Sequence, residues 1–130
     1  MKTIYVEIVK DLKRETGNIV IDRKTKRLTF TMKNGKTSTR SAADLYICFG
    51  LIRADFPDIK FLCKGAKTNV HPSRMTSQMS TGLVAYELTF GQPTEESDIV
   101  RIFDYEDNDL TNDLEAQKAY YFRWIKSLKT

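Results

Sequence analysis

The residues with the clearest potential for chemistry lie in one polar stretch of nineteen residues, Lys64–Gly82, which reads KGAKTNVHPSRMTSQMSTG. It contains His71, the only histidine of the chain, and Ser73 two positions later. A nucleophile of this kind needs a base within hydrogen-bond reach and a third group that orients the base. The sequence has no G-x-S-x-G motif. We therefore expect His71 to be a non-catalytic surface side chain, and we predict that the protein is not an enzyme.

A second group of candidates is acidic and lies near the C-terminus, in DYEDNDLTND. Its carboxylates crowd a short segment without the glycine-containing spacing of a calcium loop, so they do not predict a metal site. One interpretation is a solvated turn that caps the last helix. The other is a docking patch that steers a basic partner by complementary charge. The sequence leaves both open. The acidic residues are Asp104, Glu106, Asp107, Asp109 and Asp113.

Cysteine and histidine chemistry is sparse. Cys48 and Cys63 both sit in apolar runs, where a free cysteine behaves as a small hydrophobic residue, so we expect buried, reduced thiols. One histidine and two separated cysteines do not have zinc-ligand spacing. We predict neither a metal nor a cofactor.

Basic residues gather in a predicted hairpin over residues 23–36. They could follow the phosphates of a nucleic acid, which gives an alternative function as a small nucleic-acid-binding module. No aromatic residues interleave them, and charged hairpin tips also protect an exposed sheet edge from aggregation. These cations are Arg23, Lys24, Lys26, Arg27, Lys33 and Lys36.

The overall composition is that of a globular domain: 130 residues, 41% hydrophobic and 29% charged. We expect one domain over residues 1–130. Residues 1–80 carry 16 Lys/Arg and 7 Asp/Glu (+9), and residues 81–130 carry 5 and 10 (−5), which together give the net charge of +4. No apolar run approaches the roughly 18 residues of a membrane span, and the N-terminus does not resemble a signal peptide, so we expect a cytoplasmic protein with no membrane partner.

The elements that position these residues are predicted from periodicity. Ile4, Tyr5, Ile8, Val9 and Leu12 fit one face of a helix over residues 3–15 that ends at Gly17, although Ile4, Val6 and Ile8 also alternate as in a strand. We favour the helix and leave the strand open. Ile19–Asp22 and Arg27–Met32 predict a hairpin. The turn at Asn34-Gly35 could close a further hairpin through Lys36–Thr39, but that run has no apolar residue to bury. We therefore expect the turn to end the second strand, with Ser38 or Thr39 capping a buried helix from about Arg40 to Phe56.

The second half of the chain predicts strands at Ile59–Cys63, Leu83–Phe90 and Ile99–Tyr105. A final helix is capped by Thr111 or Asn112 and carries its apolar face to Leu128. Ser73 caps a short helical segment, RMTSQM, whose methionines could face the core or a partner, and we favour the core. The predicted order is helix, two strands, helix, three strands, helix. This is an α+β fold with an antiparallel sheet of about five strands and three helices.

Three segments, KGAKTNVHPSRMTSQMSTGLVAYEL, VRIFDYEDNDLTND and FRWIKSL, resemble small bacterial immunity proteins of contact-dependent growth inhibition systems. The resemblance implies a cytoplasmic α+β protein that binds the C-terminal toxin domain of a cognate effector, commonly a nuclease such as a tRNase, and blocks it. It carries over no contact residues by position. On physical grounds we choose Asp104, Tyr105, Glu106, Asp107 and Asp109 as partner-binding residues, and secondarily Lys67, His71 and Arg74. The positive net charge departs from that expected of an inhibitor of RNA-cutting enzymes, so either the toxin has another chemistry or the −5 half makes the contact.

Overall fold

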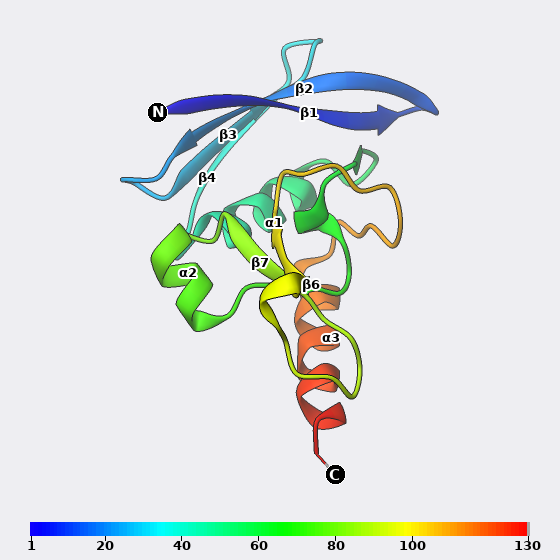
Figure 1. Ribbon diagram of the computed structural model, residues 1–130. Coiled ribbons are helices and arrows are strands. Elements are labelled where there is room, and N and C mark those ends of the chain that lie inside the picture. The colour runs from blue at the N-terminus through cyan, green and yellow to red at the C-terminus, as the bar shows by residue number, and fades with distance from the viewer. Residues whose placement is uncertain (130) are drawn as a thin grey trace.

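The computed structural model describes residues 1–129 and has an α+β fold built on two antiparallel sheets (Figure 1). The larger sheet has five strands in the order β4-β3-β2-β1-β5, and the smaller has three in the order β6-β7-β8. The strands are β1 (Lys2–Lys10), β2 (Lys13–Asp22), β3 (Arg27–Thr31), β4 (Thr37–Ser41), β5 (Lys60–Phe61), β6 (Val70–His71), β7 (Val84–Glu87) and β8 (Ile99–Arg101). The helices are α1 (Leu45–Asp55), α2 (Arg74–Ser80) and α3 (Leu114–Ser127), with single-turn 3-10 helices η1 (Lys64–Ala66) and η2 (Glu96–Asp98).

The fold class, the five-stranded antiparallel sheet and the three helices agree with the prediction, but the predicted order of elements is wrong. The chain begins with four strands, and its first helix starts at Leu45. In addition, β7 and β8, which lie within two predicted strands, form a separate sheet with β6, which lies in the polar stretch 64–82.

The predicted N-terminal helix over residues 3–15 is wrong, because the segment is strand β1 and the start of β2. Ile4, Val6 and Ile8 alternate toward the core, and β1 pairs with β2 along its whole length. Tyr5 and Leu12, which the helical pattern placed on the buried face, are 70% and 99% exposed. Cross-strand pairing buries Val6 and Ile8 with Ile4 packed against them, and it leaves in water only residues that the alternating pattern does not use, so the strand is the more stable conformation.

Gly17 is a core position of β2 rather than the end of a helix. A Cβ at Gly17 would lie 2.5 Å from Cε1 of Phe30 on the neighbouring strand. The missing side chain leaves space for the ring of Phe30, which meets Phe61 and Phe56 edge to face, with ring centroids 5.0 and 5.2 Å apart. A glycine that the helical interpretation used as a stop signal therefore serves aromatic packing.

The start of α1 also differs from the prediction. Residues after Asn34-Gly35 do not lead directly into the helix but form β4, which pairs with β3 and closes a further hairpin. Ser38 and Thr39 lie in this strand, and the helix cap is Asp44, whose side chain accepts a hydrogen bond from the backbone N–H of Ile47 at 2.8 Å. The strand has no apolar residue to bury because it is an edge strand, and Arg40 instead pairs with Asp55 of α1.

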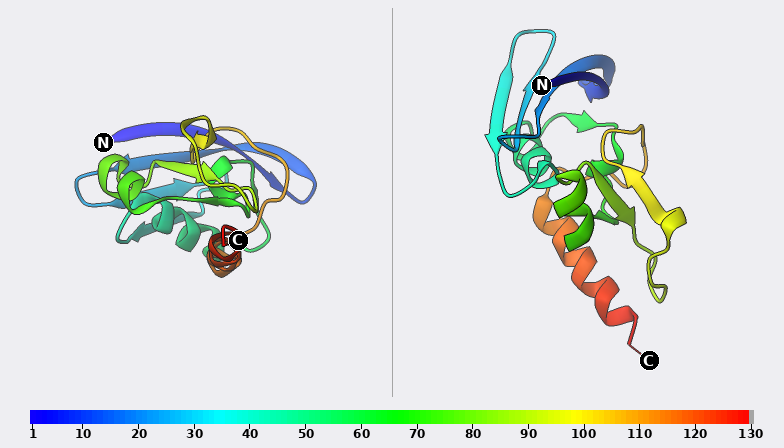
Figure 2. Two further views of the ribbon diagram at one scale, coloured as in Figure 1. Left: turned by 60° about the horizontal axis from the view of Figure 1, so that its bottom comes forward. Right: turned by 60° about the vertical axis from the view of Figure 1, so that its left-hand side comes forward.

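The main core lies between the inner face of the larger sheet and α1, as expected from the apolar composition of that helix (Figure 2). Leu45, Phe49 and Ile52 are fully buried there, and Cys48 and Cys63 are buried free thiols, as predicted. Burial raises the pKa of Cys63 to about 12. The thiol is therefore neutral at physiological pH and contributes packing.

The stretch Lys64–Gly82 is ordered rather than an irregular loop. It contains η1, β6 and α2, and Ser73 caps α2 in a reciprocal capping box with Thr76, as predicted. The prediction that its methionines are in the core is wrong: Met75 and Met79 are 57% and 76% exposed. In a two-turn helix only one narrow face can be covered, and here that face belongs to Thr76.

The last helix, α3, begins after Asp113, whose side chain caps it, rather than after Thr111 or Asn112. It runs away from the larger sheet and carries the C-terminal end of the chain to the far side of the molecule from the N-terminus (Figure 1). None of the helices in residues 1–129 is long and apolar enough to cross a membrane.

Candidate functional site

The acidic segment lies on the surface, and most of its side chains face water. Asp104, Tyr105, Asp107 and Asp109 are exposed, with Tyr105 49% exposed. Within residues 1–129, the carboxylates of Asp104, Asp107 and Asp109 form no ion pair shorter than 4.0 Å. Four of the five residues first chosen as a partner-binding patch are therefore presented together. We refer to residues 104–109 as the acidic loop.

Backbone hydrogen bonds hold the acidic loop against the segment that follows β5. The N–H groups of Lys64 and Thr68 donate to the carbonyl oxygens of Asp104 and Asp109, both at 2.8 Å. In the other direction, the N–H of Glu106 donates to the carbonyl of Leu62 at 3.2 Å. A loop whose backbone groups are paired at both ends and in the middle has few conformations to lose on binding.

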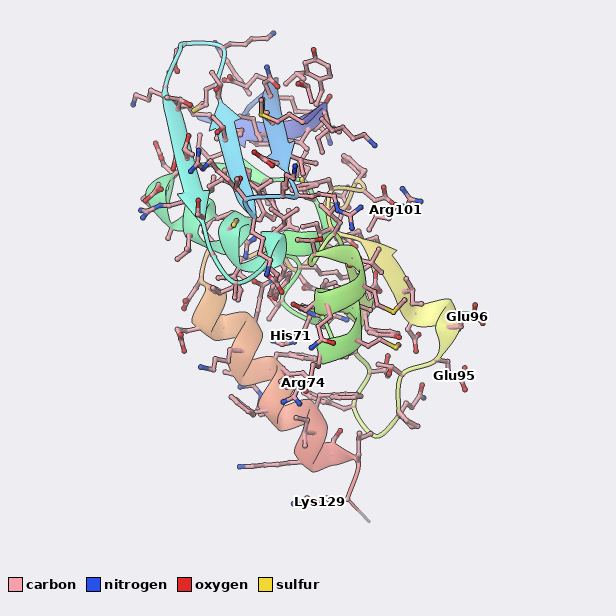
Figure 3. All side chains as sticks on the ribbon, turned by 90° about the vertical axis from the view of Figure 1, so that its left-hand side faces the viewer. His71, Arg74, Glu95, Glu96, Arg101 and Lys129 are labelled. Atoms are coloured by element: carbon pink, nitrogen blue, oxygen red, sulfur yellow. The ribbon has the colours of Figure 1, made fainter. Side chains whose placement is uncertain are left out.

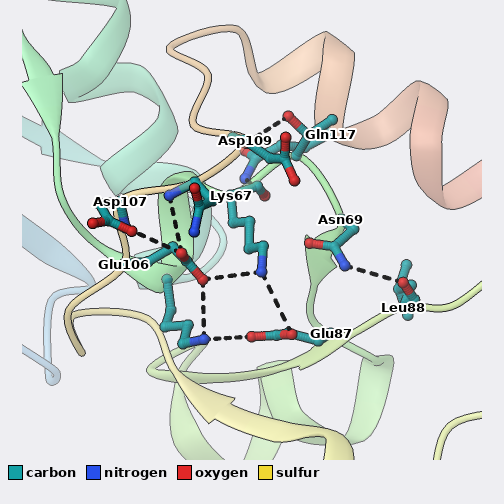
Figure 4. Close-up of polar contacts among 11 residues, drawn as sticks. Lys67, Asn69, Glu87, Leu88, Glu106, Asp107, Asp109 and Gln117 are labelled. Carbon is teal, nitrogen blue, oxygen red and sulfur yellow. Dashed lines mark hydrogen bonds and ion pairs between the residues drawn. The ribbon is translucent and has the colours of Figure 1, made fainter.

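Glu106 is the exception among the acidic residues, because its side chain is only 8% exposed and points inward (Figure 4). Its Oε1 lies 3.1 Å from Nζ of Lys64 and 3.0 Å from Nζ of Lys67, and both lysines also approach Glu87 of β7, at 2.6 and 3.7 Å. Its Oε2 accepts the backbone N–H groups of Asp107 and Asn108, both at 3.0 Å. These four side chains form a charge cluster that supports the loop from beneath.

The hydrogen bonds of Glu106 decide its ionisation. Burial raises the pKa of the carboxyl, but hydrogen bonds from Lys67, from the backbone of Asn108 and from Lys64 outweigh burial and lower the pKa to about 2. Glu106 is thus charged at all physiological pH values, and its charge is neutralised within the molecule. Its carboxylate is bonded to the support beneath the loop, and a contact of Glu106 with a partner stays a prediction.

Tyr105 is positioned by Arg14 of β2, 91 residues away in the chain. Nη2 of Arg14 donates to the phenolic oxygen at 2.8 Å, and the guanidinium lies 5.6 Å from the ring centroid. The hydroxyl in turn donates to Asp107 at 3.4 Å. An aromatic ring held in this way, half-exposed and with its hydroxyl paired, is suited to act as a rigid contact residue.

The three residues chosen secondarily do not lie together. Lys67 belongs to the charge cluster under the acidic loop, whereas His71 and Arg74 line a separate pocket between α2 and α3. Figure 3 shows His71 and Arg74 between these two helices. The predicted set of eight partner-binding residues is therefore divided between two surfaces.

His71 is held by aromatic contacts. Its ring stacks on Tyr121 of α3, with centroids 4.1 Å apart, and meets Tyr46 of α1 edge to face at 5.5 Å. Nδ1 lies 2.8 Å from the carbonyl oxygen of Pro72, so the neutral ring carries its proton on Nδ1. Burial lowers the pKa of the imidazole. Ser73 is engaged in capping α2, and no arrangement of His71 with Ser73 as base and nucleophile is present in residues 1–129.

The cations of the predicted nucleic-acid hairpin also lie in two separate places. Arg23, Lys24 and Lys26 are in the turn before β3, whereas Lys33 and Lys36 are in the turn after it. A five-residue strand is about 17 Å long, so the two basic tips lie at opposite ends of β3. Arg23 additionally donates to Thr81, which ties the first tip to α2. The nucleic-acid function stays a prediction, with two small basic tips instead of one continuous patch.

Several residues of the two surfaces could not be identified from the sequence. Arg14 contacts Tyr105 of the acidic loop, and Glu87 contacts the two lysines of the charge cluster beneath the loop. Lys118 and Tyr121 complete the α2–α3 pocket. Each comes from an element distant in the chain, and only the register of the sheets and the packing of α3 bring it into place. Their residue types are ordinary for surface positions, so the sequence carries no signal for them.

In residues 1–129, no three His, Cys, Asp or Glu side chains gather closely enough to hold a metal ion. The two surfaces present instead a rigid acidic loop and a pocket with aromatic and cationic walls. No protein-family model matches the chain, and no curated protein matches it.

Proposed function

We propose that this chain is an immunity protein, which binds the toxin domain of a cognate effector and neutralises it by occlusion, without catalysis. The observation that carries the proposal is the acidic loop, in which three carboxylates that form no ion pair within residues 1–129 and a half-exposed tyrosine are held on a hydrogen-bonded backbone. The family resemblance of the 64–88 and 100–113 segments points to the same function.

The charge of the loop indicates the kind of partner. Asp104, Asp107 and Asp109 place three negative charges within six residues, and complementary charge accelerates encounter with a basic surface. A nuclease must carry such a surface, because it binds phosphates through Lys and Arg. We therefore propose a nuclease toxin, with a tRNA-cleaving enzyme as the expected class, whose substrate-binding surface the acidic loop covers.

The support beneath the loop favours tight binding as well as fast encounter. Because the backbone is already ordered, little conformational entropy is lost on association. Tyr105 offers a large, pre-positioned contact area of the type that dominates binding energies. In this proposal the exposed aspartates set the association rate, and Tyr105 contributes to the lifetime of the complex.

The first test is co-expression with the product of the neighbouring reading frame, followed by affinity purification and by scoring growth. We expect the two proteins to purify together and growth to be rescued. A toxic neighbour that neither binds this protein nor is neutralised by it would contradict the proposal.

The second test assigns the surface. The triple variant Asp104→Asn, Asp107→Asn, Asp109→Asn should lower the association rate at low salt by about tenfold and weaken its salt dependence, because electrostatic steering accounts for factors of roughly 10–10³. Stopped-flow or surface-based kinetics at several salt concentrations measure both. Glu106 is left intact because it supports the loop.

A matched control removes the same charge elsewhere: Asp58→Asn, Glu95→Gln, Glu96→Gln. All three residues are exposed, and Glu95 and Glu96 lie at the far tip near η2 (Figure 3). We expect its association rate to stay within about twofold of the parent, since steering depends on where the charge lies. Equal losses in both triple variants would exclude the acidic loop as the specific contact surface.

A further inference from the structure

The pocket between α2 and α3 has the size and composition of a small-molecule site. Its volume is about 550 Å³, within the 300–1,000 Å³ typical of ligand pockets. One wall is α2 with Arg74 and Gln78, and the other is α3 with Lys118 and Phe122. His71 at the end of β6 and the N-terminal end of α1 complete it.

The pocket offers a surface for a planar ring. The stacked rings of His71 and Tyr121 lie along it, with an interplanar angle of 12°. Phe122, the next residue of α3, is 51% exposed at the same pocket, and its ring centroid is 5.8 Å from that of Tyr121. Aromatic surfaces arranged in this way favour offset or edge contacts with a further ring.

The pocket also offers positive charge from two walls. Within residues 1–129, Arg74 of α2 and Lys118 of α3 form no ion pair shorter than 4.0 Å. Two carboxylates line the same space. Asp44 is buried, and its oxygens accept the N–H of Ile47 and the hydroxyl of Ser77, at the positive end of the α1 dipole. Glu115 is exposed at the start of α3.

His71 supplies the third polar group. Because Nδ1 is engaged by the carbonyl of Pro72, its Nε2 is the nitrogen available to another group. Burial lowers the pKa of this imidazole, the hydrogen bond to the carbonyl of Pro72 and the charge of Asp44 oppose this change, and the charge of Lys118 adds to it. An anion in the pocket would offset Lys118 and Arg74 and thereby favour the protonated ring.

We propose that this pocket binds a small aromatic anion, a planar ring carrying a phosphate or carboxylate group. The ring lies against Phe122 and the His71–Tyr121 stack, and the anionic group lies between Arg74 and Lys118. Binding favours protonation of His71, which then donates from Nε2. The site is separate from the acidic loop and does not depend on the proposed toxin partner.

The test uses phenyl phosphate as the probe and His71 as the reporter, since the chain has one histidine and one tryptophan. The single imidazole Cε1–H resonance is followed by NMR at constant ionic strength. We expect a saturable shift, a higher His71 pKa in the presence of the probe, and tighter binding as the pH is lowered toward that pKa. Inorganic phosphate and phenol, tested separately, should each bind at least about tenfold more weakly, because each lacks one of the two contacts.

Variants locate the site. Arg74→Gln and Lys118→Gln should each weaken phenyl phosphate binding by about tenfold, the usual effect of losing one charge-assisted hydrogen bond. The controls, Lys126→Gln two turns further along α3 and Arg101→Gln on β8, remove equally exposed cations outside the pocket and should change binding by less than about twofold. An unchanged Trp124 indole resonance shows that each variant is folded.

Three results would overturn the proposal. The first is no saturable shift of the His71 signal up to about 10 mM probe, ten times a millimolar Kd. The second is equal binding of phenyl phosphate and inorganic phosphate, which would remove the role of the ring. The third is an equal loss of affinity in the pocket variants and the controls, which would indicate general charge attraction.

Discussion

Neighbouring residues of the acidic loop have different physical roles, and Glu106 is the clearest example. It stands between exposed Tyr105 and exposed Asp107, yet it is buried and bonded to two lysines and two backbone N–H groups. Removing one partner from a buried charged network costs more than the network contributes, because the remaining charges lose their compensation. The residue that looks most like part of the surface patch is its structural support.

Glu106 predicts a pH dependence of stability. Its folded pKa of about 2 lies below its usual value of 4.5, so the folded state binds fewer protons than the unfolded state in this range. The stabilisation is present above pH 4.5 and is lost as the pH falls toward 2. We expect the parent protein to be more stable than Glu106→Gln by on the order of 3 kcal/mol at neutral pH, and the difference to shrink as the pH falls through this window. Urea unfolding at a series of pH values measures it.

Asp22 and Asp55, whose pKa values are also lowered by hydrogen bonds, are present in both proteins and cancel in the difference. A stability difference that stays constant between pH 5 and pH 2 would show that the Glu106 carboxylate does not contribute as described. If Glu106→Gln still rescues growth at neutral pH, the substitution has lowered the stability of the protein without removing partner binding.

Arg53 is a second residue whose role comes from burial. It is fully buried in α1 and has no carboxylate partner in residues 1–129; it donates instead to Gln117 at 2.6 Å and to the carbonyl of Thr111 at 3.1 Å, with its guanidinium 4.6 Å from the ring centroid of Phe49. Burial lowers its pKa to about 10, so it remains charged at neutral pH. Gln117 in turn donates hydrogen bonds from Nε2 to the carbonyls of Gly65 and Lys67. These bonds link α1, α3 and η1.

At the scale of elements, α1 and α3 approach each other at one glycine. A Cβ at Gly50 would lie 2.6 Å from Cδ1 of Leu114, the first residue of α3. The close neighbour of Gly50 is therefore a side chain of another helix. Glycine at position 50 lowers the helix propensity of α1, but its missing side chain allows the contact between α1 and α3.

This contact predicts that the effect of Gly50→Ala on the free energy of unfolding changes sign when Leu114 is also shortened. Gly50→Ala alone should destabilise the protein by up to about 2 kcal/mol, because overpacking costs about 1–3 kcal/mol and the better helix propensity returns about 1 kcal/mol. In a Leu114→Ala background the methyl group has space, so the same substitution should stabilise by up to about 1 kcal/mol. Denaturant unfolding of the four proteins gives the coupling. Additive effects would mean that Leu114 does not limit the space at Gly50.

At the scale of the whole molecule, the two sheets are joined by one helix and by backbone hydrogen bonds, and they are not independent units. Helix α1 covers the larger sheet through Phe49 and reaches the smaller one through Tyr46, whose hydroxyl donates to the carbonyl of Val70 in β6 at 2.7 Å. The segment after β5 is hydrogen-bonded to the acidic loop after β8. The elements on both sides are therefore continuous in packing and in hydrogen bonds.

This continuity predicts a single cooperative unfolding transition. Trp124, the only tryptophan, is buried on α3 and donates to the carbonyl of Gln92, so its fluorescence reports the smaller-sheet side. Far-UV circular dichroism includes the larger sheet. We expect the two signals to give the same midpoint in urea, as single domains of this size usually do. A fluorescence midpoint clearly below the dichroism midpoint would indicate two units and contradict the predicted single domain.

Much of the fold could be predicted wherever local pattern and tertiary environment agree. The apolar run that forms α1, the β2–β3 hairpin, the Ser73 cap and the buried cysteines each carry a signal within a few residues. The N-terminal strand could not be predicted securely, because Ile4–Leu12 satisfies both a helical and an alternating pattern and only pairing with β2 distinguishes them. β4 was missed because an edge strand needs no apolar residues.

The sequence by itself determined the fold class, the positions of the main helix and hairpin, and the presence of an acidic run near the C-terminus. These depend on composition and short-range periodicity, which are local properties of the chain. The tertiary structure alone decided that Glu106 is buried while its neighbours are exposed, that Arg14 holds Tyr105, and that His71 and Arg74 face Lys118 and Tyr121 across a pocket. Burial and charge pairing depend on residues tens of positions apart, and no local pattern encodes which of them will meet.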